Sequence, residues 1–190
     1  MWNEKEMLHY LKLNLKESRL RHSLNVSETA VTLAAIYGEN IEKARIAGLV
    51  HDCVKNKTDA ELIKLAIEHE IQLDEIYLKN PSILHGLVGS IMAREVMGIY
   101  DEDILNAICY HTTGRKNMSL LEKIIYIADY IEPLRKFNGV EELRSLSNID
   151  LDAAVMMSFD NTIKYIISQK GLLHTDTIEA RNYLLSKYSR

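Results

Sequence analysis

Apolar residues recur along most of this chain at intervals of three and four positions, which is the spacing of an α-helix. The clearest case lies between residues 19 and 37. Gly38 follows it directly, and a glycine in this position often ends a helix because it adopts left-handed backbone at low cost. We therefore predict a helix over 19–37 whose buried face contains His22, Val26, Ala30, Leu33 and Tyr37.

A second apolar stripe, rich in small side chains, comes after Gly38. Small residues at a helix contact shorten the distance at which two helices pack. The pattern predicts a helix at about 41–53 that lies close against a neighbour. Its stripe consists of Ile41, Ala44, Ala47, Gly48 and His51.

Polar residues mark where other helices begin. Thr58 with Glu61, and Ser119 with Glu122, have the spacing of capping boxes, and Asn-Pro-Ser at 80–82 supplies cap and first-turn residues. No strand-like alternation extends beyond a few residues, so we predict an all-α bundle of about nine helices in a single domain over 1–190. The helices are expected at roughly 3–16, 19–37, 41–53, 58–70, 81–97, 101–111, 119–132, 150–169 and 176–188.

Composition and charge restrict the possible partners. The chain has 190 residues, 47% of them hydrophobic, and a net charge of −4, which argues against a surface that coats nucleic acid. Residues 1–16 lack the apolar core of a signal peptide, and no stretch approaches the roughly 20 apolar residues of a membrane span. Cys53 and Cys109 are too few and too far apart for a disulfide framework. We expect a cytoplasmic protein with free thiols and with neither nucleic-acid nor membrane partners.

The dipeptide His51-Asp52, at the end of a predicted helix, is the strongest chemical signal in the chain. Imidazole and carboxylate are the ligands that catalytic transition metals use most. Two adjacent ligands cannot complete a site, so the remaining ones must come from other helices. The candidates are His22, His85, His111 and Asp129.

Each candidate also has an ordinary structural explanation. A single histidine on an apolar face can be a core imidazole bonded to a carbonyl. Asp129 ends the apolar run 124–129, where a buried carboxylate is costly unless a cation compensates it, and an arginine could serve as that cation instead of a metal. As an ordered set, however, these residues favour a metal site. His9, His69 and His174 lie among polar neighbours and are predicted to be surface residues.

Five segments around these residues resemble one known family. They are RLRHS at 19–23, HDCVK at 51–55, PSILHG at 81–86, HTTGR at 111–115 and ADYIEPLR at 128–135. Together they resemble the bacterial symmetrical bis(5'-nucleosyl)-tetraphosphatases (diadenosine tetraphosphate hydrolases) of the HD-domain metal-dependent phosphohydrolases. Leu20 departs from the pattern, because an aromatic residue is expected there. The resemblance covers 19 to about 150, the expected catalytic portion, on which the helices at 150–188 would pack.

The resemblance implies a helical HD domain that holds iron. His22, His51, Asp52 and Asp129 would be the ligands, with His51 and Asp52 also catalytic. Manganese, cobalt or zinc would suit the same donors, and one or two ions could bind. Two further histidines, His85 and His111, would hold either a second metal or a phosphate.

The implied reaction is hydrolysis of diadenosine tetraphosphate to two ADP by a metal-activated hydroxide. The alternatives are hydrolysis of mononucleotides at the same site and a non-catalytic nucleotide-sensing module. A homodimer is possible. The candidate substrate-binding residues are Arg19, Lys55, Thr112 and Arg135. Each could equally be an ordinary surface or loop residue. Four aromatic residues could stack on adenine: Tyr110, Tyr126, Tyr130 and Phe137. Aromatic residues at helical spacing are more often part of the core.

Overall fold

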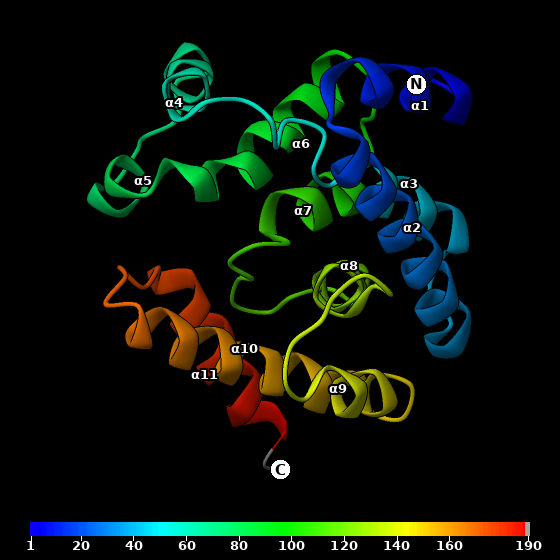
Figure 1. Ribbon diagram of the computed structural model, residues 1–190, viewed down its shortest axis with the longest axis vertical. Coiled ribbons are helices and arrows are strands. Elements are labelled where there is room, and N and C mark those ends of the chain that lie inside the picture. Colours follow the sequence, from blue (N-terminus) through cyan, green and yellow to red (C-terminus); the bar gives the residue numbers. More distant parts are fainter. Residues whose placement is uncertain (189–190) are drawn as a thin grey trace.

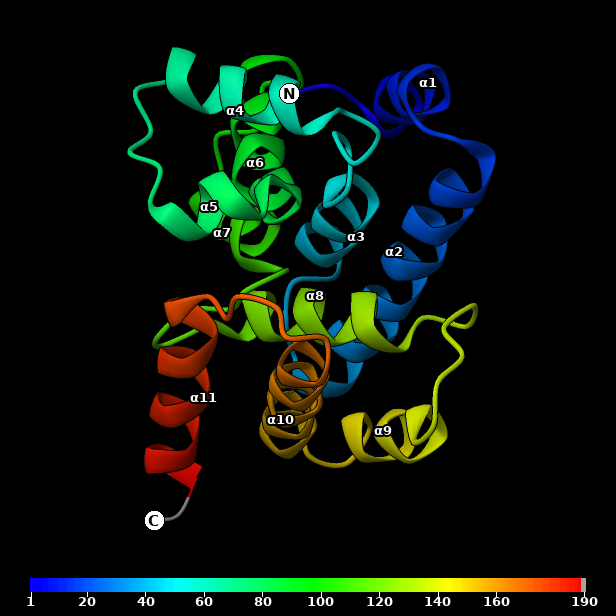
Figure 2. The same cartoon turned by 60° about the vertical axis from the view of Figure 1, so that its left-hand side comes forward.

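The structure is a computed structural model that describes residues 1–188. Within them it contains eleven α-helices, one 3-10 helix and no strand, which confirms the all-α prediction. Helix α8 crosses the middle of the molecule, with α4–α7 on one side and α9–α11 on the other (Figure 2). The helices are α1 (Glu4–Asn14), α2 (Glu17–Tyr37), α3 (Ile41–Val50), α4 (Asp59–Glu68), α5 (Glu75–Lys79), α6 (His85–Glu95), α7 (Glu102–Tyr110), α8 (Leu120–Ile131), α9 (Val140–Ser147), α10 (Leu151–Ser168) and α11 (Thr175–Tyr188), with the 3-10 helix at Pro81–Leu84.

Helices α2 and α3 lie side by side and are closely packed (Figure 1). Gly38 ends α2 with φ +74°, as predicted from the sequence. A Cβ atom built on Gly48 of α3 would lie only 2.8 Å from the Cα atom of Ser27 in α2. The small-residue stripe therefore does allow a close helix approach, and this approach sets the distance between the ends of α2 and α3.

Local capping accounts for several helix starts. Thr58 with Glu61 and Ser119 with Glu122 form the predicted capping boxes, in which each side chain bonds the other residue's backbone N–H. The helix expected over 81–97 is divided into the 3-10 helix, which begins at Pro81, and α6.

The prediction of about nine helices was too low because two short helices escaped it. Helix α5 has five residues, which is too few to show a helical period, and none of them is fully buried. Helix α9 (Val140–Ser147) has eight residues, and the residue before it, Gly139, has a φ of +91° and makes no side-chain cap. Among the helices of residues 1–188, none is both long and apolar enough to cross a membrane.

The prediction that His174 is a surface residue is wrong. Only 7% of His174 is exposed, and its ring lies 4.8 Å from the ring of Tyr77 in α5. The segment between α10 and α11 packs against α5, and this long-range contact buries an imidazole that has polar neighbours in the sequence. His9 is exposed as predicted, whereas His69 is partly buried and its Nε2 lies 2.9 Å from Glu95.

Candidate metal centre

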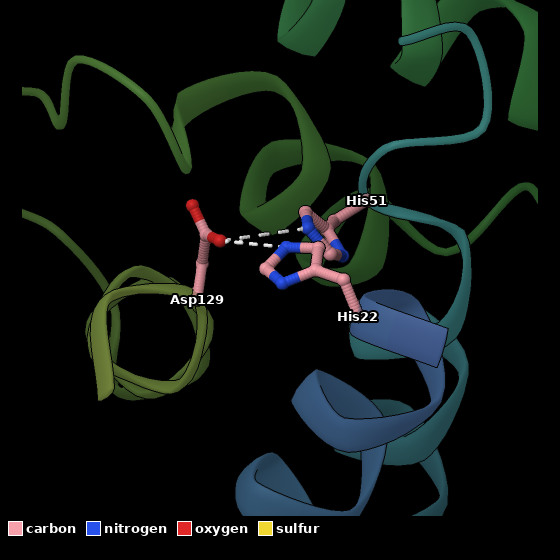
Figure 3. Close-up of side chains that lie close together, drawn as sticks. All are labelled: His22, His51 and Asp129. Carbon is pink, nitrogen blue, oxygen red and sulfur yellow. Dashed lines mark ion pairs between the residues drawn. The ribbon is translucent and has the colours of Figure 1, made fainter. Parts of the chain in front are cut away.

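Three separate helices bring His22, His51 and Asp129 together (Figure 3). His22 is on the second turn of α2, His51 directly follows α3, and Asp129 is in the last turns of α8. The Oδ1 atom of Asp129 lies 2.9 Å from His22 Nε2 and 3.9 Å from His51 Nε2. Asp129 keeps 22% of its side chain exposed, so it forms part of a cavity wall.

Asp52 lies between two groups of imidazoles and presents one oxygen to each. Its Oδ2 atom is 3.8 Å from His22 Nε2 and 3.5 Å from His51 Nε2. Its Oδ1 atom is 3.2 Å from His85 Nε2 and 3.6 Å from His111 Nε2. The side chain is 2% exposed. A single buried carboxylate is thus shared by both halves of the cluster.

His85 and His111 form the second half of the cluster. Their Nε2 atoms are 3.0 Å apart, and the Oγ1 atom of Thr112 lies 3.1 Å and 3.2 Å from them. His85 begins α6 and His111 directly follows α7. A Cβ atom on Gly86 would lie 2.6 Å from the backbone oxygen of Cys109, so the absence of a side chain there lets α6 approach α7.

All four imidazoles are oriented by a hydrogen bond at Nδ1. For His51, His85 and His111, the acceptor is the backbone oxygen three residues earlier, at 2.7, 2.5 and 2.7 Å respectively. For His22 it is the Glu132 carboxylate at 3.1 Å. Because a carbonyl or carboxylate only accepts, each Nδ1 carries a proton, and Nε2 is the ring nitrogen whose lone pair a metal ion would take.

Several of these inward-facing atoms lack a hydrogen bond. Among the described residues, His22 Nε2, His51 Nε2 and Asp52 Oδ1 are buried without a hydrogen-bond partner. Buried lone pairs that face one another are costly without a compensating cation. The donor set, imidazole nitrogen and carboxylate oxygen from several helices, therefore fits a divalent metal ion.

The cluster strongly affects the ionisation of its own carboxylates. Burial alone would raise the pKa of Asp52, but His51, His111 and His85 bring it well below its usual range. Burial opposes ionisation of Asp129 in the same way, and His22, His51 and Arg135 lower its pKa well below the usual value. Both carboxylates are anionic at neutral pH, as metal ligation requires.

The four predicted substrate-binding residues all lie beside the cluster. Thr112 contacts His85 and His111, as described above. Arg19 donates to Asp52 Oδ2 at 2.9 Å, and Arg135 donates to Asp129 Oδ1 at 2.5 Å. The arginine partner that the sequence offered as an alternative to a metal at Asp129 is therefore present too. The Lys55 Nζ atom is 2.9 Å from His85 Nε2, and burial lowers the pKa of Lys55.

A cavity of about 420 Å³ opens from the cluster. Tyr130 and Phe137 line its wall, with ring centres 5.2 Å apart in an edge-to-face arrangement. Tyr126 also borders it but is 3% exposed and packs on Phe159, and Tyr110 lies under the Arg115 guanidinium. Two further lining residues from α10, Thr162 and Tyr165, have no motif-like neighbours and were not predicted from the sequence.

Sequence reasoning also missed Glu132. It lies in the segment ADYIEPLR, directly after α8, and is 2% exposed. The signal in the sequence that could have identified it is its place within this segment, directly before Pro133. Arg115, in HTTGR, binds Glu122 through two nitrogens and so anchors the 111–119 segment to α8.

Acid should destabilise the metal-free protein through His85. Burial, the largest influence, lowers the pKa of His85 below its usual value of about 6.5. Between the lowered folded-state pKa and 6.5, the unfolded chain binds more protons, so stability is lost as the pH falls through this window. Urea unfolding with a chelator should show a lower free energy of unfolding at pH 5.5 than at pH 7.5, and a smaller difference in His85→Gln. The exposed His9→Gln is the control. Equal differences in all three proteins would refute this origin.

Comparisons with known proteins identify one family. The HD domain family matches residues 19–134. A symmetrical bis(5'-nucleosyl)-tetraphosphatase from Halalkalibacterium halodurans is 42% identical over 183 residues, covering 96% of this chain and 97% of the relative. One from Bacillus subtilis is 40% identical over 184 residues, covering 97% and 98%.

A solved structure is similar over nearly its whole length. It comes from Clostridium acetobutylicum and is described as a predicted HD superfamily hydrolase involved in NAD metabolism. The TM-score is 0.97 at 57% sequence identity, and the match covers 98% of this chain and 99% of the other. The chain therefore belongs to the HD-domain family and is a full-length homologue of the bacterial symmetrical bis(5'-nucleosyl)-tetraphosphatases.

Proposed function

We propose that this protein is a metal-dependent hydrolase that cleaves diadenosine tetraphosphate symmetrically into two ADP. The observation that carries the proposal is the Asp52 carboxylate, which is buried between two imidazole pairs and presents one oxygen to each. The names of the two near-full-length relatives support the choice of substrate.

In this proposal His22, His51, Asp52 and Asp129 hold one metal ion. His85 and His111, with the other oxygen of Asp52, hold a second ion or a phosphate of the substrate. Iron is the expected metal, and manganese, cobalt or zinc suit the same donors. When bound, a metal ion would act as a Lewis acid and make a neighbouring water more acidic.

The protein's own side chains would bind and orient the polyphosphate. Arg19, Lys55 and Arg135 surround the cluster and supply positive charge for phosphate oxygens, and Thr112 supplies a hydroxyl donor. Water forms a bond to one of the two central phosphorus atoms while the bond from that phosphorus to the central bridging oxygen breaks. The water releases a proton, and each half of the substrate leaves as ADP.

The aromatic wall of the cavity would receive one nucleobase. Phe137 is 38% exposed and lies next to Tyr130 at the cavity, so it can stack on a base without displacing core packing. Base–aromatic stacking contributes about 1–3 kcal/mol, so Phe137→Ala should raise the KM for diadenosine tetraphosphate by about tenfold with a smaller change in kcat. Steady-state kinetics measures this. Tyr100→Ala, which removes an exposed aromatic side chain outside the cavity, should leave KM unchanged. An unaltered KM in Phe137→Ala would exclude this wall as the base site.

Product analysis tests the proposed reaction. Metal-loaded protein incubated with diadenosine tetraphosphate should release ADP alone, and a chelator should stop the reaction. Equal amounts of ATP and AMP would show asymmetric cleavage and contradict the proposal. Rapid phosphate release from mononucleotides, with the dinucleotide left intact, would favour the mononucleotide hydrolase. Absence of turnover with every nucleotide would favour a binding module.

A further inference from the structure

The Glu132 carboxylate accepts three hydrogen bonds at the point where the end of α8 contacts α2. Its Oε1 atom lies 3.1 Å from His22 Nδ1, and its Oε2 atom accepts from Asn25 Nδ2 at 2.9 Å and from the backbone N–H of Leu134 at 2.7 Å. All three partners act as donors. An ionised carboxylate, which only accepts, is the side chain that satisfies them together.

His22 needs this partner because of its place in the chain. His51 and His111 directly follow α3 and α7, and His85 follows the 3-10 helix, so each Nδ1 finds a backbone oxygen three residues earlier. His22 lies inside the continuous helix α2, where backbone oxygens are already used by the helix itself. Its Nδ1 acceptor must therefore come from another element, and Glu132 supplies it.

The backbone around Glu132 is itself held in place by Arg144 of α9. The Arg144 guanidinium donates to the backbone oxygens of Ile131 at 2.8 Å, Glu132 at 2.8 Å and Arg135 at 3.0 Å. These bonds fix the turn that leaves α8. Helix α9 thereby connects to the metal centre, although none of its side chains belongs to the cluster.

We propose that Glu132 is a positioning residue that keeps the proton of His22 on Nδ1 and so presents the Nε2 lone pair to a metal ion. The inference rests on the proposed metal site. A carboxylate behind a ligating imidazole orients the ring and raises its basicity. Among the four cluster imidazoles, His22 is held in this way by a charged side chain, whereas the other three are held by backbone oxygens.

The Glu132→Gln substitution separates this role from simple packing. Glutamine has nearly the same shape, but one end of its amide is a donor. Facing the amide oxygen toward Asn25 and Leu134 satisfies two donors and turns the NH₂ group toward His22. The His22 Nδ1 atom must then accept, which moves its proton to Nε2, the atom that faces the metal site. We therefore expect the variant to fold with its ligand atom blocked.

Two measurements on the full-length protein test this. Nitrogen-15 correlation spectra of the histidine rings, recorded on metal-free protein, should show His22 protonated at Nδ1 in the wild type and at Nε2 in Glu132→Gln. Titration with Mn²⁺ should give a dissociation constant raised by about 10–100-fold in the variant. Glu142→Gln makes the same chemical change at an exposed position of α9 and should match the wild type in both measurements.

The outcomes distinguish this inference from the proposed function. If the wild type binds Mn²⁺ and Glu132→Gln binds it equally tightly with His22 protonated at Nδ1, the positioning role is wrong and the metal site stands. A wild type that binds no metal ion would overturn both. Should the variant fail to fold, the wild-type spectrum still decides, because a His22 proton on Nε2 contradicts the role directly.

Discussion

Replacing Asp52 by asparagine should reduce kcat for diadenosine tetraphosphate hydrolysis by about 10³-fold or more, which corresponds to roughly 4 kcal/mol of lost transition-state stabilisation. The carboxylate presents one oxygen to His22 and His51 and the other to His85 and His111. Asparagine keeps the volume but removes the charge and turns one of these atoms into a donor. One half of the cluster, depending on the orientation of the amide, would then face an NH₂ group.

The Asp52→Asn variant should also bind less metal, and elemental analysis together with steady-state kinetics measures both effects. Asp59→Asn is the matched control, since it makes the same change at an exposed position in the first turn of α4. Wild-type turnover in Asp52→Asn would show that the shared carboxylate is not part of the catalytic centre. Full turnover together with full metal content would exclude it as a ligand as well.

Gly48→Ala should destabilise the fold by about 2 kcal/mol and impair the site as well. The added Cβ atom would lie 2.8 Å from the Cα atom and 3.1 Å from the amide nitrogen of Ser27, both backbone atoms that cannot rotate away. Helices α2 and α3 must separate, which moves His22 relative to His51. The better helix propensity of alanine, worth about 1 kcal/mol, offsets only part of this cost.

Gly89→Ala provides a close control for Gly48→Ala, because it is also a helical glycine near the site. Its added Cβ atom would meet neighbours at 3.5 Å or more, which is ordinary van der Waals contact. Urea unfolding should show that Gly89→Ala is at least as stable as the wild type while Gly48→Ala is less stable. If both substitutions were equally well tolerated, the close α2–α3 approach would not be what sets the ligand geometry.

Features determined by neighbouring residues could be predicted from the sequence. The capping boxes that start α4 and α8 involve residues three positions apart, and the glycine that ends α2 acts through its own backbone. Helix α9 could not be predicted in this way. It is short and follows a glycine with positive φ, and Arg144 connects it to the turn after α8 through contacts that exist only in the folded protein.

The candidate site shows the same division. Imidazoles and carboxylates in motif-like segments identified the cluster, because residue type alone suggests metal ligation. The partition of Asp52's two oxygens and the bond between His22 and Glu132, residues 110 positions apart, depend on how α2 packs against α8. Both Tyr126 and Tyr130 border the cavity, but Tyr126 is buried and Tyr130 is only partly buried; periodicity could not separate them because they lie one turn apart on the same face of α8.

Anomalous X-ray diffraction from crystals of the metal-reconstituted protein, collected at the absorption edge of the metal, would locate the metal ion. We predict an anomalous peak within bonding distance of His22 Nε2, His51 Nε2, Asp52 and Asp129. A second peak beside His85 and His111 would show that two ions bind. Its absence would favour the alternative, in which these histidines bind a phosphate of the substrate. A metal peak elsewhere on the molecule, with the space between these four side chains empty, would contradict the proposed metal site.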